Sequence, residues 1–354
     1  MTNELASYYS RILPLPFMTL EKLKIVQERL ATIIGVGGLG TVSTEQLLSL
    51  GVGKLRIVDR DIIENHNLPR QKLFFIKDVG DAKVEVAKKF LTKRNPFAKI
   101  ETLTESFDYS NSERILHGSD IIVDGLDNFQ TRKVLNKTAY QLNIPWVFGG
   151  ALGTSGNVMT ITFRENTPCF NCFFDQIVDE GLPTCETAGV SSSILALVAS
   201  IQVNEAIRIL IEEKPLLEGK LLFVDLVDYQ MEIINIEQRD DCSVCSENAE
   251  LMVEEVSDEF SSEYCGKLTV VTLCERERFI VKPEKKPDVN FDKAQSFLER
   301  KFSGKKFGSY GYEFKYKDAE IFLMRTFVMS IKNPKSPENA VVLFKKVVEL
   351  LQNA

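Results

Sequence analysis

A glycine-rich turn is the first feature of the sequence that could do chemistry. Gly35-Val36-Gly37-Gly38-Leu39-Gly40 follows the apolar run Ala31–Ile34 and opens a helical segment. Glycines let backbone N–H groups and a helix N-terminus approach phosphate groups. Asp59 ends the next apolar run about 20 residues later, where a carboxylate can bind ribose hydroxyls. These residues predict a nucleotide site, and by themselves they fit an NAD- or FAD-binding Rossmann domain as well as an ATP-binding one.

Two CxxC pairs account for four of the seven cysteines. They are Cys169 with Cys172 and Cys242 with Cys245. Each pair can offer two thiolates to one metal ion, and together they complete the closed tetrahedral site that structural zinc prefers. A redox-active CxxC is the alternative, but neither pair opens a helical segment, where such thiols are activated. The spacing therefore favours a structural zinc site.

Further polar blocks accompany the glycine turn. They are Tyr9-Ser10-Arg11, the segment Asp61–Gln71 with the sequence DIIENHNLPRQ, Lys83, and Asp124-Gly125-Leu126-Asp127-Asn128. In this order, with the paired cysteines, they resemble the ubiquitin-activating superfamily. The similarity is to the bacterial and archaeal adenylyltransferases that activate sulfur-carrier proteins for molybdopterin and thiamine synthesis. It extends over 8–245, and the archaeal type is the expected origin.

The resemblance implies an enzyme that uses ATP and Mg²⁺ to adenylate the C-terminal glycine of a ubiquitin-like carrier protein ending in Gly-Gly, with release of pyrophosphate. Arg70 and Lys83 suit the stabilisation of charge on phosphate oxygens, and Asp127 suits Mg²⁺. The full nucleotide set implied is Gly35, Gly37, Gly38, Gly40, Asp59, Asp61, Asn67, Arg70, Lys83, Asp127 and Asn128. The loop departs from the family pattern at His66 and Pro69, which flank Asn67 and Leu68.

Two further catalytic residues follow from the resemblance. Arg11 matches an arginine that in relatives reaches the active site of the other subunit, which implies a homodimer. Cys185 lies in a Thr-Cys-x-x-x-Gly-Val context, where relatives carry a cysteine on a loop that crosses the nucleotide site. A reactive thiol at that position could accept the activated acyl group as a thioester. The plain alternative is a small buried residue that packs the loop.

Other functions remain open on the sequence alone. Related enzymes of the tRNA threonylcarbamoyladenosine dehydratase type adenylate a small carboxylate on modified tRNA, and the basic C-terminal region could favour RNA. The paired cysteines and the Cys185 context favour a protein carrier instead. A non-catalytic scaffold or an NAD-binding protein is a third possibility, which the presence of Arg70, Lys83 and Asp127 together argues against.

Composition bounds these readings. The 354 residues are 44% hydrophobic and 26% charged, as in globular proteins, which excludes a disordered chain or a coiled-coil rod. The net charge of −7 argues against a general nucleic-acid binder. No apolar stretch reaches the ~20 residues of a membrane span, and the first residues lack the pattern of a signal peptide. We therefore expect a cytoplasmic protein without membrane association, whose thiols stay reduced.

Strand-length apolar runs alternate with helix-length segments through the first half of the chain. Such alternation predicts βαβ units and a parallel sheet. Beyond Gly149, a strand at 156–163, a long apolar helix at 194–211 and a hairpin over 220–236 predict the rest of a mixed sheet. The expected fold is thus an α/β, Rossmann-like adenylation domain with a zinc site, over residues 1–248.

A change in composition marks a second domain. Residues 249–264 are rich in Asp, Glu and Ser and suit a linker. Residues 265–354 predict a small α+β domain of ββαββα pattern, whose position is analogous to that of the ubiquitin-fold domain that recruits conjugating enzymes. From Ser261 onward there are 18 Lys and Arg against 12 Asp and Glu, a net +6 that suits an acidic protein partner. Cys265, Cys274 and the aromatic alternation Tyr310–Tyr316 are expected to pack in its core.

Overall fold

The computed structural model describes residues 3–174, 187–246, 260–262, 264–272, 278–307, 311–325 and 327–352. The chain forms two compact units, Met1–Leu251 and Met252–Ala354, here the N-terminal and C-terminal units. Most of the expected linker, 249–264, falls outside the described residues, so its character remains a prediction. Each unit is considered by itself.

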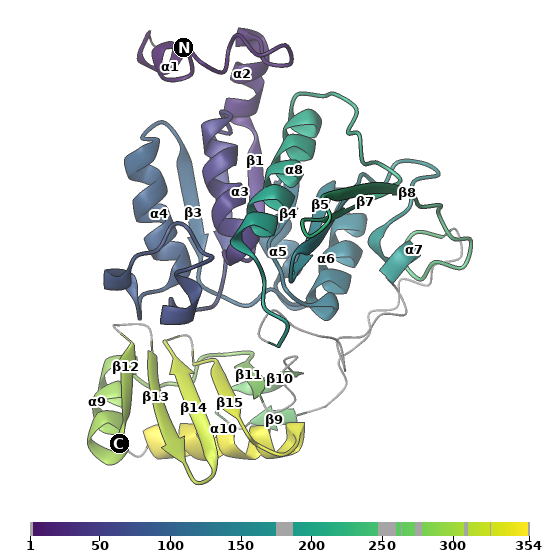
Figure 1. The fold of residues 1–354 in the computed structure, drawn as a ribbon. Coiled ribbons are helices and arrows are strands. Elements are labelled where there is room, and N and C mark those ends of the chain that lie inside the picture. The colour runs from purple at the N-terminus through teal and green to yellow at the C-terminus, as the bar shows by residue number, and fades with distance from the viewer. Residues whose placement is uncertain are drawn as a thin grey trace. The chain divides into compact units, whose positions relative to one another are not determined.

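The N-terminal unit is built on one mixed sheet with the strand order β3-β2-β1-β4-β5-β6-β7-β8 (Figure 1). Strands β1 to β5 pair in parallel, and β5 to β8 pair antiparallel. The strands are β1 Leu30–Ile34, β2 Lys54–Val58, β3 Lys99–Leu103, β4 Ile121–Asp124, β5 Trp146–Leu152, β6 Ser155–Ile161, β7 Lys220–Asp225 and β8 Gln230–Asn235. The predicted Rossmann-like mixed sheet is confirmed.

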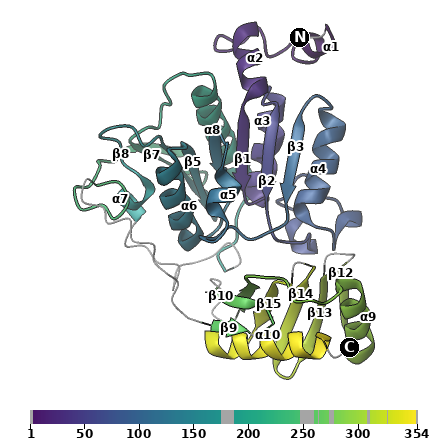
Figure 2. The same cartoon turned by 180° about the vertical axis from the view of Figure 1, so that it is seen from behind.

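Helices cover both faces of this sheet, because alternate residues of the buried strands point to opposite sides. Ile33 packs with one layer of helices and Ile34 with the other. The first layer contains α2 Leu20–Glu28, α3 Gly38–Ser49, α4 Lys83–Arg94 and α8 Ser192–Leu210. The second, seen in Figure 2, contains α5 Ser112–Leu116, α6 Phe129–Leu142 and α7 Phe170–Phe174.

Helix α8 is the central packing element of the first layer. It contacts α3 and strands β4, β5 and β6. Among the described helices it is the one whose length and apolar composition would suffice to cross a membrane, but 56% of that stretch is buried inside the unit. Its hydrophobicity is therefore accounted for by core packing.

The C-terminal unit is a seven-stranded sheet in the order β12-β13-β14-β15-β11-β10-β9, with antiparallel pairs throughout its described part. Its elements are β9 Phe260–Ser262, β10 Gly266–Thr272, β11 Arg278–Pro283, α9 Phe291–Lys301, β12 Gly304–Phe307, β13 Gly311–Tyr316, β14 Ala319–Met324, β15 Met329–Lys332 and α10 Pro337–Gln352. The predicted α+β class is confirmed, with more strands than the six-element pattern. β14 and β15 are separate strands, because the chain turns between them where the Met324 N–H donates to the Val328 carbonyl (2.9 Å).

Two similar halves make up this unit. Each is a three-stranded meander followed by a helix: β9-β10-β11-α9 and β13-β14-β15-α10. The halves join where β11 pairs with β15. Tyr312, Phe314 and Cys265 are buried in the core of this unit, and Tyr316 is partly buried against it. The packing roles expected for these four residues are confirmed. Tyr310 and Cys274 lie outside the described residues.

Candidate functional site

The glycine turn follows β1 and is packed too tightly for any side chain at two of its positions. Gly35 has φ +92°, and a Cβ there would lie 2.5 Å from the Gly125 carbonyl oxygen. A Cβ on Gly40 would lie 1.9 Å from the Gly35 carbonyl oxygen. Gly37 immediately precedes α3, and because it has no side chain it does not cap the N–H groups of the first turn. The N-terminus of α3 thus follows directly on the carboxyl end of the central strand β1, where an anion site would require it.

Asp59 ties the glycine turn to the end of β2. One of its carboxylate oxygens, Oδ2, accepts a hydrogen bond from the Val36 N–H (2.7 Å), and Oδ1 accepts one from the Asp61 N–H (2.8 Å). Burial is the largest influence on this carboxyl group and raises its pKa, against the opposing effect of Lys83. The predicted ribose-binding residue therefore lies beside the predicted phosphate turn.

Lys83 is the buried cation of the site. Its side chain is 7% exposed, and its Nζ donates to Asp61 Oδ2 at 2.9 Å. Burial alone would lower the pKa of Lys83, but the charges of Asp61 and Asp59 outweigh it and raise the pKa above its ordinary value, with a smaller contribution from Asp127. Burial would raise the pKa of Asp61, but Lys83 and Arg60 hold it well below its usual range. Both partners are therefore charged at neutral pH.

Asp127 and Asn128 stand in the loop between β4 and α6. Asp127 is exposed, and its Oδ1 accepts a hydrogen bond from Asn128 Nδ2 (3.1 Å). Asn128 caps α6, since its Oδ1 accepts from the Thr131 N–H (2.8 Å). Because Asp127 acts electrostatically on Lys83, the carboxyl ends of β2 and β4, which lie on either side of β1, contribute to one charged cluster.

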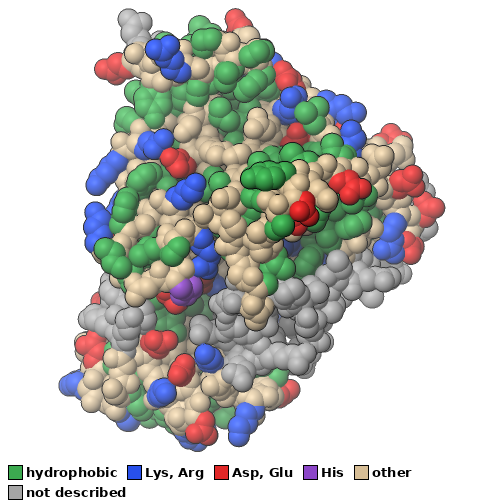
Figure 3. Space-filling view, in the orientation of Figure 1, with side chains coloured by type: hydrophobic (Ala, Val, Ile, Leu, Met, Phe, Trp, Pro, Cys, Tyr) green, Lys and Arg blue, Asp and Glu red, His purple; other side chains and the backbone are tan. Residues whose placement is uncertain are grey.

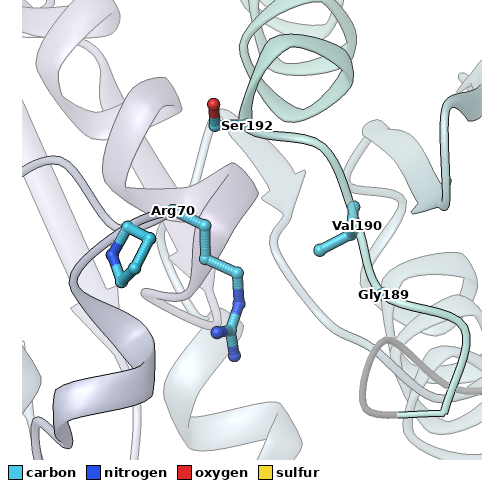
Figure 4. Close-up of a pocket in the computed structure, with 5 residues that line it drawn as sticks. Arg70, Gly189, Val190 and Ser192 are labelled. Carbon is cyan, nitrogen blue, oxygen red and sulfur yellow. The ribbon is translucent and has the colours of Figure 1, made fainter.

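Arg70 lines an open pocket of about 320 Å³ with Pro69, Gly189, Val190 and Ser192. Figure 4 shows its side chain in the space between its own loop and the segment that leads into α8. The guanidinium donates to the His66 carbonyl oxygen. Among the described side chains no carboxylate forms an ion pair with Arg70. Its charge is therefore available to an anionic ligand, despite the unusual His66 and Pro69 nearby.

Asn67 lies in the same loop and is buried. Its Oδ1 accepts a hydrogen bond from the Glu64 N–H (3.0 Å), within the short 3-10 turn Asn65–Asn67. This bond stabilises the loop that carries Arg70. The structure thus gives Asn67 a bracing contact, and its expected hydrogen bond to a nucleotide remains a prediction.

Gln71 is a site residue that the sequence analysis did not single out. Its side chain is buried (3% exposed), and its Oε1 has no hydrogen-bond partner among the described residues. Its Nε2 lies 4.0 Å from the place a Cβ of Gly37 would occupy. An unpaired buried amide oxygen is costly unless a ligand or water satisfies it. Its position next to Arg70 in the sequence was the available clue.

A buried ion pair supports the loop that carries Asp127. Arg132 Nε donates to Asp124 Oδ2 at 2.8 Å, with side chains 5% and 0% exposed. The same guanidinium donates to the carbonyl oxygens of Leu126 (2.6 Å) and Gly149 (2.8 Å). Arg132 therefore fixes the loop by bonds to its backbone. Arg132 belongs to none of the sequence motifs, since its partners are brought together only by the fold.

Arg11 is not brought to this cluster. It is exposed and lies two residues after Tyr9, whose hydroxyl donates to the Leu48 carbonyl oxygen (3.2 Å) near the end of α3. Ten residues separate Leu48 from Gly38, so the two ends of this helix are about 15 Å apart. Within one chain Arg11 is thus placed toward the end of α3 opposite the glycine turn. Cys185 lies outside the described residues, and its role remains a prediction.

The four cysteines of the CxxC pairs form one buried cluster, as their spacing predicted. Their Sγ atoms all lie within 4.8 Å of one another. Cys169 and Cys242 are 3.5 Å apart at sulfur, and Cys172 and Cys245 are 3.4 Å apart. The cluster joins α7 to the segment that follows β8. This arrangement of four thiols can hold one metal ion.

An exposed apolar strand lies at the other edge of the sheet from β3. All six residues of β8 are exposed, and Met231, Ile233 and Ile234 are among the large hydrophobic side chains open to solvent. Figure 3 shows hydrophobic side chains gathered over this part of the N-terminal unit. An unpaired, apolar edge strand is a common place for association with another protein.

A family model confirms what this geometry indicates. The model described as the ThiF family matches residues 9–244, more than half of the chain. The chain belongs to the ThiF family. The match spans the glycine turn, the Lys83 cluster and all but the last of the paired cysteines, so the site of this ThiF-family protein lies inside the shared region. The suspected kinship with sulfur-carrier activating enzymes is confirmed.

Named relatives are similar over most of their own length. The SAMP-activating enzyme E1 of Haloferax volcanii is 36% identical over 63% of this chain and 83% of its own. The molybdopterin-synthase adenylyltransferase of Salmonella typhimurium is 30% identical over 68% and 96%. The sulfur carrier protein adenylyltransferase of Thermus thermophilus is 32% identical over 70% and 93%. These names support an adenylyltransferase and favour a carrier protein over the tRNA substrate considered above.

Solved structures show the same fold. The Escherichia coli MccB structure with ATP superposes with a TM-score of 0.60 at 22% identity, over 70% of this ThiF-family chain and 75% of MccB. PaaA superposes with a TM-score of 0.58 at 23% identity, over 67% and 84%. At these identities the likeness confirms the architecture of the N-terminal unit alone.

Proposed function

We propose that this protein uses ATP to adenylate the C-terminal glycine of a ubiquitin-like or sulfur-carrier protein. The observation that carries the proposal is Lys83, buried against Asp61 at 2.9 Å and under the charge of Asp59 and Asp127, beside a glycine turn. An NAD site needs one carboxylate at the ribose. A buried lysine among three carboxylates fits a site that binds the triphosphate of ATP together with a metal cation, as acyl adenylation requires, better than it fits an NAD site.

In the proposed reaction a carboxylate oxygen of the carrier attacks the α-phosphorus of ATP, and pyrophosphate departs with the bonding electron pair. Negative charge increases on the phosphate oxygens during this step, so fixed cations accelerate it. Lys83 is held in place by its ion pair with Asp61, and Arg70 lines the pocket between its own loop and the segment that leads into α8. Arg70 and Lys83 thereby orient the phosphates, while Asp59 positions the ribose.

Asp127 is the proposed magnesium-binding residue. It is exposed, close enough to act on Lys83, and supplies the hard oxygen ligand that Mg²⁺ prefers. Magnesium bound there would neutralise charge on the phosphates. Asn128 orients the Asp127 carboxylate through their 3.1 Å hydrogen bond.

The cysteine cluster fits structural zinc. A tetrahedral zinc with sulfur ligands at about 2.3 Å places the sulfurs about 3.8 Å apart, and the observed separations range from 3.4 Å up to 4.8 Å. Cys169, Cys172, Cys242 and Cys245 would hold the ion. It would join α7 to the end of the N-terminal unit without taking part in adenylation.

Cys185 is proposed to accept the activated carboxyl group. Its thiolate would attack the adenylate carbonyl, forming a thioester as AMP leaves. The segment that carries it is anchored at both described ends. Phe174 packs in the aromatic cluster beside the cysteines, and Gly189 and Ser191 pair with Gly153 through N–H···O bonds of 2.9 and 2.7 Å.

The active form is proposed to be a homodimer in which Arg11 completes the site of the other subunit. The placement of Tyr9 near the far end of α3 supports this, because it keeps Arg11 away from the Lys83 cluster of its own chain. The carrier is proposed to dock on the exposed apolar strand β8. The C-terminal unit is proposed to recruit a conjugating enzyme, and the cytoplasm is the proposed location.

Pyrophosphate exchange tests the adenylation. The full-length protein is incubated with ATP·Mg, labelled pyrophosphate and each carrier of the same genome that ends in Gly-Gly. We expect label to enter ATP with at least one carrier. Arg70→Ala and Asp127→Ala should abolish this exchange, and Cys185→Ala should retain it.

A matched carrier that lacks its last glycine is the control and should give no exchange. If no carrier ending in Gly-Gly supports exchange, the proposed function is wrong. If an adenylate forms but Cys185→Ala still yields a thioester-linked carrier on denaturing gels, only the role of Cys185 is wrong.

A further inference from the structure

A fully buried asparagine on α6 contacts the cysteine cluster. Asn136 is 0% exposed, and its Nδ2 lies 3.4 Å from Cys169 Sγ and 3.0 Å from Asn171 Oδ1. Its Oδ1 accepts a hydrogen bond from the Phe170 N–H (3.2 Å). Because a backbone N–H can only donate, this bond fixes the oxygen toward Phe170 and the amide N–H groups toward the sulfur.

The same amide begins a chain of contacts between the two CxxC turns. Asn171, within the first pair, donates from its Nδ2 to Ser243 Oγ (3.2 Å), within the second pair. Asn136, Asn171 and Ser243 therefore connect α6 to both turns by side chains alone. No metal is needed for these bonds, so they can place the thiols before an ion arrives.

The apolar surroundings of the cysteine cluster make the hydrogen bond donated by Asn136 important. The cluster packs among apolar side chains that include Trp146, Phe148 and Phe170. Four thiolates around one divalent ion leave excess negative charge, which an apolar environment does not stabilise. Hydrogen bonds to metal-bound sulfur spread that charge and orient the ligand.

We propose that Asn136 is a positioning residue of the four-cysteine site, which sets how tightly the metal is held by donating to Cys169 and by aligning the first CxxC turn. The proposal rests on the zinc site of the proposed function. It differs from a purely structural role in one respect: the loss should appear in metal binding more than in folding.

The test uses the full-length protein loaded with Zn²⁺, or with Co²⁺ as a spectroscopic probe. Asn136→Leu keeps the size of the side chain and removes its polar atoms, and Asn136→Ser keeps a small polar group that is too short to reach the sulfur. Both variants should bind metal roughly 10- to 100-fold more weakly than the wild type in competition with a chelator. Both should also show altered thiolate-to-cobalt absorption bands.

Thr138→Val is the matched control on the same helix. Thr138 is buried and its hydroxyl bonds to Ser112 Oγ (2.8 Å), away from the cysteines. This variant should lose stability without a change in metal affinity or in the cobalt spectrum. If Asn136→Leu does not fold, the comparison of Asn136→Ser with Thr138→Val decides.

Two results overturn the proposal in distinguishable ways. Wild-type protein that takes up neither Zn²⁺ nor Co²⁺ removes the metal site together with the role of Asn136, while pyrophosphate exchange tests adenylation independently. Wild-type protein that holds metal no more tightly than Asn136→Leu and Asn136→Ser leaves the site standing and removes only the assignment to Asn136.

Discussion

Lys83 is the residue on which the charges of the site depend. Two groups of opposite charge determine each other's ionisation here: Asp61 and Asp59 raise the pKa of Lys83, and Lys83 lowers that of Asp61. The stability that Lys83 contributes is present below the pKa of a free lysine, about 10.4, and is lost as pH rises through its higher folded value. The stability that Asp61 contributes is present above about pH 3.9, the pKa of a free aspartate, and is lost as the pH falls through its lower pKa in the folded state.

The first prediction concerns Lys83→Met. Removing a fixed cation that faces developing phosphate charge should reduce pyrophosphate exchange by roughly 10²- to 10³-fold. Because Lys83 stays protonated, the ratio of wild-type to variant ATP affinity should be constant from about pH 6 to about pH 9.5. Calorimetric titration with ATP·Mg measures it. An inflection of that ratio inside this range would contradict the assigned ionisation.

Gln71 gives a second prediction at this scale. Gln71→Leu removes an amide whose oxygen has no partner in the described part of the chain, so the melting temperature should not fall. If the amide oxygen accepts a hydrogen bond from a donor group of the bound nucleotide, such as a ribose hydroxyl, the KM for ATP should rise roughly 10-fold or more. Ser43→Ala is the control, since Ser43 Oγ is likewise buried and has no partner among the residues that the structure describes, and it should leave this KM unchanged. An unchanged KM in Gln71→Leu would separate Gln71 from the nucleotide.

At the scale of elements, α6 links the two candidate sites. Asn128, Arg132 and Asn136 follow one another at intervals of four residues, which places them on one side of the helix. The first caps the helix beside Asp127, the second holds the loop through the Leu126 carbonyl, and the third contacts Cys169. One rigid helix therefore joins the nucleotide end of the unit to the cysteine end.

The third prediction follows from that connection. Stripping the metal with a chelator should lower the melting temperature and also weaken ATP binding, because the CxxC turn that α6 contacts is then no longer joined through the ion to the second pair of cysteines. Zinc analysis should give one ion per chain in the wild type and in Cys185→Ser, and none in Cys172→Ser. ATP affinity that is identical with and without metal would show that the two ends of α6 are independent.

The elements that the sequence predicted well are the buried ones. Apolar runs mark the buried strands β1, β2 and β4, and a helical repeat of apolar residues marks the helices between them, because these residues pack in the core. β3 was missed because Lys-Ile-Glu-Thr-Leu forms the sheet edge and is polar at alternate positions, with none of its residues fully buried. The same limit applied to the site. Gly35 and Asp127 belong to local motifs, whereas Arg132 acquires its partners on β4, on the loop after β4 and on β5 only when the chain folds.

At the scale of the whole molecule, the N-terminal unit contains the candidate adenylation site and has its own core. The C-terminal unit has a separate core, and the Salmonella relative is matched over 96% of its length by 68% of this chain. The proposed adenylation thus belongs to the N-terminal unit, and the proposed recruitment of a partner belongs to the C-terminal unit.

The fourth prediction separates these roles. A chain ending at residue 251 should fold cooperatively and retain pyrophosphate exchange at a rate close to that of the full protein, since the Lys83 cluster and the cysteines are all present. Transfer of the carrier to a downstream protein should be lost. Exchange that disappears although the shortened chain melts as a folded protein would place part of the adenylation site in the C-terminal unit.

The hydrogen bond from the Tyr9 hydroxyl to the end of α3 far from the glycine turn has consequences for mixtures of variants and for dilute enzyme. If each site borrows Arg11 from a neighbour, Arg11→Ala and Arg70→Ala are defective alone but repair each other when mixed, because a mixed pair contains one site with both arginines intact. Equal mixing should restore about a quarter of the wild-type exchange. Specific activity should also decline as the enzyme is diluted below the dissociation constant of the dimer. Two recessive alleles of one gene would then complement.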